Sequence, residues 1–160
     1  MIFTGQSDLT IDAKQRLAIP AKYRSLLKPD RDGTAWYCVP WGESKLALYT
    51  ERRFEEIVER RELTLTPDET ESAMDSAFFG MCERIEPDAA GRIVIPKRHQ
   101  ELANLGEDVV VVGCGKYLEI WDSKRWNERF NQNFKNLPTI VNELKQRGAK
   151  GQGTGNGAEG

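Results

Sequence analysis

Two aspartate–arginine pairs are the residues of this 160-residue chain whose spacing is best suited to chemistry. Asp12 stands four residues before Arg16, and Asp88 stands four residues before Arg92. Two aspartates brought together could share a proton and act as an acid–base pair. Alternatively, each carboxylate closes a turn and orients its own arginine by a charge-assisted hydrogen bond. Because the sequence contains no nucleophile–base pair or phosphate-binding loop, we favour the second interpretation and predict no enzyme activity.

Cysteine and histidine do not suggest a cofactor or a metal site. Cys38, Cys82 and Cys114 form no pair at metal-ligand spacing, and their odd number gives no closed set of disulfides. His99, the only histidine, falls in an expected helix without cysteine or carboxylate at ligand spacing. We therefore expect structural roles for these four residues, with no cofactor and no metal.

The two aspartate–arginine pairs belong to a nine-residue element that occurs twice. Residues 12–20 and 88–96 both consist of Asp, three residues, Arg, an aliphatic residue, one residue, Ile and Pro. A second block, at 46–54, matches residues 118–126 in the same order. Equal order and nearly equal spacing indicate a tandem duplication of a unit of roughly 75 residues.

Hydrophobic alternation predicts a strand on each side of the aspartate turns, and Pro20 and Pro96 are suited to open short helices. Thr50 is expected to cap a helix at 51–63, and Thr66 a helix at 67–79. The apolar stripe of that second helix, which includes Met74, is expected to be core. The expected strands are 2–11, 16–19, 36–40, 45–49, 109–112 and 118–121.

Positive charge is unequally distributed between the copies, although the whole chain carries a net charge of only −2. Residues 12–31 contain six basic and two acidic residues, whereas residues 88–107 contain three of each. A rigid turn that projects an arginine suits phosphate binding or a bidentate contact with guanine. The first copy, where Lys14, Lys22 and Arg24 add positive charge, is therefore a candidate nucleic-acid-binding loop. Alternatively, Lys22 and Arg24 form a solvated helix face, and Arg16 pairs only with Asp12.

The repeated element resembles the SpoVT-AbrB-type DNA-binding unit. Two such elements, with Phe3-Thr4-Gly5 at the start and a Trp/Phe-containing helix near the end, resemble the MraZ family of bacterial transcriptional regulators over residues 1–145. The resemblance implies a mostly β fold with α-helices (α+β), built from two tandem swapped-hairpin barrel units. The implied divisions are a first unit at 1–50, a helical linker at 51–78, a second unit at 79–122, C-terminal helices at 123–147 and a disordered glycine-rich tail at 148–160.

The resemblance also implies a function. It predicts a sequence-specific regulator of the division and cell-wall gene cluster that binds double-stranded DNA as a ring-like homo-oligomer on direct repeats. Asp12 and Asp88 are expected to orient the loops. The DNA-binding residues are expected to be Arg16, Lys14, Lys22, Arg24, Arg92, Lys97 and Arg98.

Two departures from the family pattern concern the turns. The first has Gln15 where the family has glycine, and the second has Ala90 where the family has lysine. Arg92 is therefore expected to contribute less to DNA binding than Arg16. The alternative function is a protein-interaction or scaffold module of the same barrel class with no DNA role.

Localisation is expected to be cytoplasmic and nucleoid-associated, with no membrane partner and no small-molecule substrate. The first residues lack the pattern of a signal peptide, and no window is apolar enough to span a bilayer.

Overall fold

The computed structural model describes residues 1–42, 44–62 and 64–152. Two units divide the chain, Met1–Ser123 and a C-terminal unit that begins at Lys124. Both copies of the repeat lie in the first unit, so the duplicated sequence forms one body.

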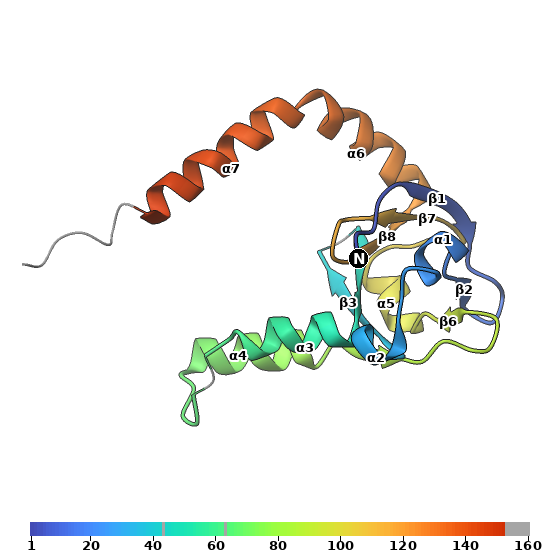
Figure 1. Ribbon diagram of the computed structural model, residues 1–160, viewed down its shortest axis with the longest axis horizontal. Coiled ribbons are helices and arrows are strands. Elements are labelled where there is room, and N and C mark those ends of the chain that lie inside the picture. Colours follow the sequence, from blue (N-terminus) through green and yellow to red (C-terminus); the bar gives the residue numbers. More distant parts are fainter. Residues whose placement is uncertain (43, 63, 153–160) are drawn as a thin grey trace, which may run out of the picture. The chain divides into compact units, whose positions relative to one another are not determined.

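Alternating apolar residues of both repeats form a six-stranded antiparallel sheet in the described part of the chain (Figure 1). Its order is β1-β7-β8-β4-β3-β5, which is unchanged when the strands of one repeat are exchanged for their equivalents in the other. The fold is therefore α+β, with pseudo-twofold symmetry between β8 and β4. The strands are β1 (Gln6–Thr10), β3 (Trp36–Trp41), β4 (Lys45–Thr50), β5 (Glu83–Ile85), β7 (Asp108–Gly113) and β8 (Leu118–Asp122).

The two repeats are interleaved by strand pairing. β1 of the first repeat pairs with β7 of the second, and β5 of the second pairs with β3 of the first. Strands β4 and β8 join the halves at the centre of the sheet. Each repeat therefore completes the sheet of the other, and neither contains a complete hydrophobic core of its own.

The core contains matched apolar side chains from the two repeats. Leu17 and Ile93 are both fully buried, as are Leu48 and Ile120. The aliphatic run in β7 is buried at Val109–Val111, whereas Val112 is partly exposed. Since burial of apolar surface drives folding, this shared core stabilises both repeats together.

Short helices follow the aspartate turns, and two longer helices connect the repeats. Thr50 caps α3 as predicted, because its side chain accepts a hydrogen bond from the backbone N–H of Arg53. The described helices of this unit are α1 (Ala21–Arg24), α2 (Pro29–Asp32), α3 (Glu51–Glu59), α4 (Glu69–Phe79) and α5 (Lys97–Leu102).

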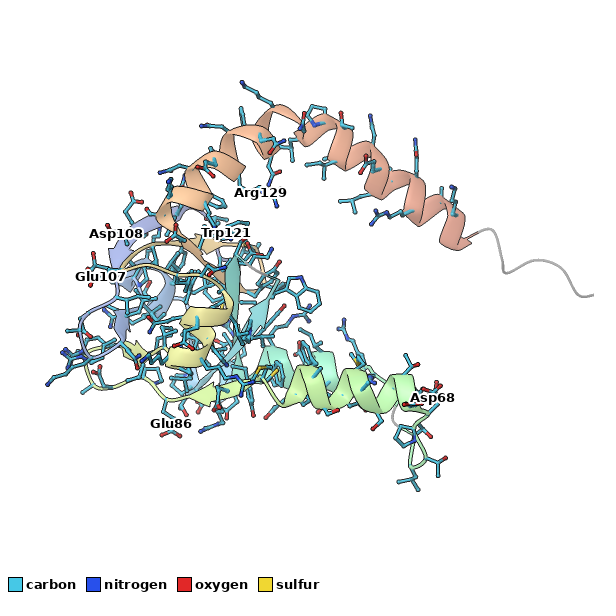
Figure 2. All side chains as sticks on the ribbon, turned by 180° about the vertical axis from the view of Figure 1, so that it is seen from behind. Asp68, Glu86, Glu107, Asp108, Trp121 and Arg129 are labelled. Atoms are coloured by element: carbon cyan, nitrogen blue, oxygen red, sulfur yellow. The ribbon has the colours of Figure 1, made fainter. Side chains whose placement is uncertain are left out.

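The predicted start of α4 is wrong by two residues. Asp68, and not Thr66, is the N-cap (Figure 2). Its carboxylate accepts from the backbone N–H of Glu71 at 2.8 Å, and the Glu71 carboxylate accepts from the backbone N–H of Asp68 at 2.9 Å. This reciprocal capping box satisfies two backbone donors at the start of the helix.

The expectation that the apolar stripe of α4 is core is also wrong. No residue of α4 is buried, and Met74 is 47% exposed. The helix packs through its C-terminal end, where Phe78 and Phe79 lie against a small cluster around Val39 and Phe54. Helices α3 and α4 thus form a hairpin joined to the sheet at one end.

The C-terminal unit is helical. Helix α6 (Ser123–Lys135) is followed by α7 (Leu137–Gln152), and Pro138 lies in the first turn of α7. The helix continues five residues beyond the boundary expected at residue 147, and the rest of the expected tail, residues 153–160, lies outside the described residues. Among the described residues, no helix has the length and apolarity needed to cross a bilayer.

His99 occupies the place in the second repeat that Tyr23 has in the first, and both are almost fully buried. Desolvation lowers the pKa of His99, while the backbone of Met81 partly opposes this shift. The unfolded chain takes up the proton near the ordinary value of 6.5, and the folded chain only at lower pH. Stability contributed by the neutral imidazole is thus complete above pH 6.5 and is lost as pH falls below it.

We expect His99→Gln to flatten the dependence of unfolding free energy on pH below about 6.5, relative to the parent chain. Urea unfolding at a series of pH values measures this. Carboxylates with lowered pKa, such as Asp12, take up protons only at more acidic pH. Their effect on the unfolding free energy should be the same in parent and variant and serves as an internal reference. Equal slopes for parent and variant would contradict the assignment.

Candidate nucleic-acid interface

Each aspartate turn is closed by its own carboxylate. In the first turn, Asp12 Oδ1 accepts from the backbone N–H groups of Lys14 at 2.9 Å and Arg16 at 2.8 Å. Its Oδ2 accepts from Arg16 Nε at 2.7 Å. Hydrogen bonding to the Arg16 backbone is the largest cause that lowers the pKa of Asp12. The carboxylate is therefore held ionised and fixes the arginine.

The second turn repeats this arrangement. Asp88 Oδ1 accepts from the backbone N–H groups of Ala90 and Arg92, both at 2.9 Å, and Oδ2 accepts from Arg92 Nε at 2.8 Å. The backbone of Arg92 likewise lowers the pKa of Asp88. Both aspartates are committed to their own turns, which is the orienting role expected of them and differs from a shared-proton pair.

Gln15 adopts the same left-handed backbone as its equivalent, Gly91. The φ angles are 62° and 75°, so loss of the family glycine has not changed the first turn. A side chain in this conformation costs roughly 1–2 kcal/mol relative to glycine. Glycine would remove this strain, but it loses more conformational entropy on folding, which offsets part of the gain.

We expect Gln15→Gly to stabilise the chain by about 0.5–1 kcal/mol. Gln15→Ala is the matched control, since it removes the same side chain but keeps the strain. Thermal unfolding measures both variants, and an equal effect of the two would contradict the attribution to backbone strain.

The turns are joined by a ribbon of two strands, β2 (Arg16–Ala18) and β6 (Arg92–Val94). In the antiparallel register Arg16 faces Val94, Leu17 faces Ile93 and Ala18 faces Arg92. Side chains alternate across a ribbon, so the two arginines share one face as a diagonal pair, with Cα atoms roughly 7–8 Å apart.

The other face of the ribbon anchors it to the core. Leu17 and Ile93 are fully buried, whereas Ala18 and Val94 on the arginine face are exposed. Two further hydrogen bonds extend the pairing, from Ile19 N–H to the Gly91 carbonyl and from Ile95 N–H to the Gln15 carbonyl. The arginines therefore project from a fixed platform.

The terminal guanidinium nitrogens of both arginines are not used in the contacts with their orienting aspartates. The Asp12 and Asp88 contacts use Nε, and the side chains of Arg16 and Arg92 remain 30% and 38% exposed. Among the described residues, we find no hydrogen bond to the Nη atoms of either arginine. An arginine held in this way offers a planar fork to phosphate or guanine.

Arg24 does not lie at the first turn, where the sequence had suggested it. Its Nε donates to the Ile19 carbonyl at 2.9 Å, and its Cδ, Nε and Cζ pass so close to Gly91 that a Cβ there would lie within 2.5–2.9 Å of them. The ribbon is antiparallel, so a helix that follows one turn in sequence packs beside the other turn in space. Arg24 therefore supplies positive charge to the second turn.

The other basic residues are distributed around the same surface. Lys22 is bound to the Gln6 carbonyl at 3.0 Å and lies 4.9 Å from the Tyr23 ring centroid, away from the turn that precedes it in sequence. Lys97 and Arg98 are exposed on α5. Lys97 borders a shallow depression with Gln15, so α5 of the second repeat accompanies the first turn.

Ala18 and Val94 could not be recognised as members of this surface from the sequence alone. They became part of it only through the cross-repeat register of β2 and β6. The repeated Arg-x-x pattern marks both positions, but the pairing partner cannot be read from either copy alone.

Together these features define a duplicated α+β protein that presents an arginine-bearing β-ribbon. The family model described as "MraZ protein, putative antitoxin-like" matches residues 2–75 and 78–147. Transcriptional regulator MraZ of Coxiella burnetii (strain Dugway 5J108-111) is 33% identical over 125 residues, covering 78% of this chain and 82% of the relative. The proteins of the same name from Shewanella frigidimarina (strain NCIMB 400) and Chromobacterium violaceum are 31% and 34% identical, covering 81% and 78% of this chain and 86% and 84% of the relatives.

The match covers both repeats and most of the C-terminal helices. This chain belongs to the MraZ family.

Proposed function

We propose that this chain is a sequence-specific DNA-binding transcriptional regulator and that the exposed face of the β2–β6 ribbon binds double-stranded DNA. The observation that carries the proposal is the diagonal pair Arg16 and Arg92, each fixed at Nε by an aspartate and open at its outer nitrogens. A two-stranded ribbon fits a major groove about 12 Å wide, where arginine forks distinguish guanine from the other bases.

Both turns contribute to this site. The second turn lacks the lysine that the first has in Lys14, but Arg24 lies beside it. The positive charge around the two turns is therefore more nearly equal in the folded chain than in the two sequence segments. We accordingly expect Arg92 and Arg16 to contribute comparably to DNA binding. Lys97 and Arg98 add phosphate contacts from α5.

Assembly supplies the affinity that one small basic patch lacks. The chain carries a net charge of −2, so a single ribbon provides little general attraction to DNA. We propose a ring-like homo-oligomer of swapped-hairpin barrel units, in which successive ribbons bind direct repeats and gain from avidity. The target is the division and cell-wall gene cluster, and the site of action is the nucleoid in the cytoplasm.

The relatives' names are those of regulators and not of enzymes, and this chain is a non-enzyme. No cofactor, membrane partner or small-molecule substrate has a part in the proposed function.

Enrichment of genomic DNA tests the proposal. Purified protein is incubated with sheared DNA of the source genome, and retained fragments are sequenced and compared with the input. We expect promoter fragments with direct repeats upstream of the cluster, with retention that falls as salt rises. Retention without sequence preference, or no retention, would instead favour the scaffold alternative.

A further inference from the structure

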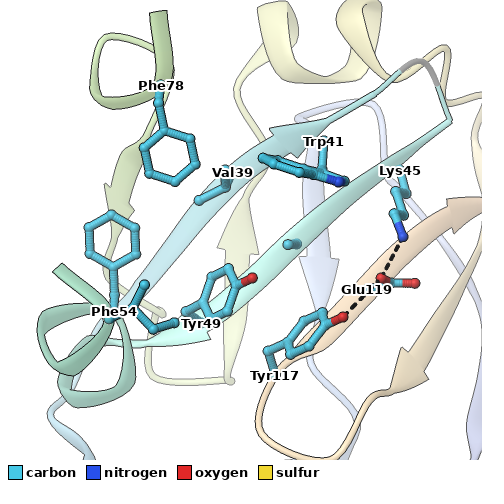
Figure 3. Close-up of a pocket in the computed structure, with 10 residues that line it drawn as sticks. Val39, Trp41, Lys45, Tyr49, Phe54, Phe78, Tyr117 and Glu119 are labelled. Atoms are coloured by element: carbon cyan, nitrogen blue, oxygen red, sulfur yellow. Dashed lines mark hydrogen bonds and ion pairs between the residues drawn. The ribbon is translucent and has the colours of Figure 1, made fainter. Parts of the chain in front are cut away.

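A second candidate binding surface is an aromatic groove beside helices α3 and α4 (Figure 3). None of the residues that line it belongs to the β2–β6 ribbon. It has a volume of about 380 Å³ and is formed by β3, β4, β8 and the two linking helices. We define the aromatic groove by Val39, Trp41, Tyr49, Phe54, Phe78 and Tyr117.

The groove is apolar along most of its length and closed at one end by a satisfied polar group. Glu119 is only 7% exposed, and its carboxylate accepts from Lys45 Nζ at 2.7 Å and Trp121 Nε1 at 2.8 Å. Trp41 and Ile57 at its border are 59% and 38% exposed. Large apolar side chains displayed together in this way mark a binding surface.

A matching apolar stripe runs along the C-terminal helices. Its members are spaced three and four residues apart, so those within each of the two helices share one face of that helix. All remain between 39% and 67% exposed: Phe130, Phe134, Leu137, Val141 and Leu144.

The charges of the two elements are opposite. Helices α3 and α4 contain seven carboxylates and two arginines, a net charge of −5. Helices α6 and α7 contain seven basic residues and two carboxylates, a net charge of +5. Complementary charge favours encounter and fixes the partner, while aromatic burial supplies affinity.

We propose that the aromatic groove is the docking site for helix α6 of a second copy of this chain, with Phe130 and Phe134 entering it. The groove and the helix are different surfaces, so the contact is head-to-tail. Each added copy leaves one groove and one helix open, which leads to a closed ring or a filament. The inference deepens the proposed homo-oligomer and does not depend on DNA binding.

Two variants test the interface from its two sides. Phe130→Glu removes an aromatic ring from the helix and leaves the groove intact. Trp41→Lys places a cation in the groove and leaves the helix intact. Both positions are exposed, so the fold of the first unit is expected to tolerate the changes, which circular dichroism and thermal unfolding verify.

We expect light scattering, without DNA, to give an oligomer for the parent and the mass of one chain for each variant. An equimolar mixture of the variants is expected to give twice that mass, because the mixture retains one intact groove and one intact helix in each pair. Asn131→Glu and Met74→Lys introduce the same charges beside the stripe and outside the groove, and should assemble like the parent.

Three results would overturn the proposal. Parent-like assembly of Trp41→Lys would mean that the helices associate with each other. A mixture that stays at the mass of one chain would exclude the head-to-tail contact. A parent at the mass of one chain would leave the groove to a different occupant, such as a small apolar ligand. Loss of DNA binding alone, with the oligomer intact, would contradict only the proposed function.

Discussion

Replacement of both Arg16 and Arg92 by alanine is expected to abolish specific DNA binding while leaving folding and oligomer size unchanged. Both side chains point outward from a ribbon whose other face is buried, so their removal leaves no cavity in the core. If they contact phosphate, each loss lowers the salt slope by about 0.9. If they fork onto guanine, each loss reduces discrimination by about 1–3 kcal/mol. Fluorescence anisotropy with labelled DNA over a range of salt distinguishes the two.

The single variants test how much each turn contributes to DNA affinity. We expect Arg16→Ala and Arg92→Ala to weaken binding to a similar extent, because Arg24 compensates for the missing lysine of the second turn. Arg16→Lys keeps the charge but loses the fork, so it separates phosphate attraction from base recognition. Arg52→Ala removes a cation from α3 and should bind like the parent. Parent-like binding by the double variant would exclude the ribbon as the DNA-binding surface.

Leu17→Ala is expected to destabilise the chain by about 2–5 kcal/mol, the cost of removing a fully buried leucine side chain. The ribbon contains three residue pairs and depends on its buried face for its position. Loss of this anchor should also loosen the arginines, so DNA binding is expected to weaken even below the melting temperature.

Val94→Ala is the matched control for the ribbon. Val94 lies on the exposed face and is 51% exposed, so its truncation should change the unfolding free energy by less than about 0.5 kcal/mol. Urea unfolding measures both variants. A small effect of Leu17→Ala would show that the ribbon is not held by its underside.

Local features were predictable from sequence because their causes are local. The Asp-x-x-x-Arg turns close through hydrogen bonds within five residues. Thr50 caps α3 from the preceding position, and the apolar run at Val109–Val111 requires burial wherever the strand lies. The α+β class, by contrast, was expected from the resemblance to the MraZ family. The start of α4 was wrong because two capping signals, Thr66 and Asp68, competed over two residues.

Features that depend on topology were not predictable. The sequence gives no pairing partner for β1 or β5, which each complete the other repeat's part of the sheet. Arg24 follows the first turn in sequence but lies beside Gly91, so charge summed along a segment misplaces it. The exposure of Met74 was not predictable for the same reason. An apolar stripe shows that a helix has an apolar face, but it does not show which other element, if any, covers that face.

Photo-crosslinking from the exposed face of the β2–β6 ribbon tests directly whether this face binds DNA. On the exposed face, Ala18 lies next to Arg16 on the same strand and directly opposite Arg92, and Met74 is an exposed position on α4. A photoreactive p-benzoylphenylalanine is placed at either position, and each protein is irradiated with the DNA enriched from the genome. We expect a covalent protein–DNA product from position 18 that competitor DNA of the same sequence abolishes, and none from position 74. Crosslinking from position 74 but not from position 18 would contradict the assignment of the ribbon as the DNA-binding face.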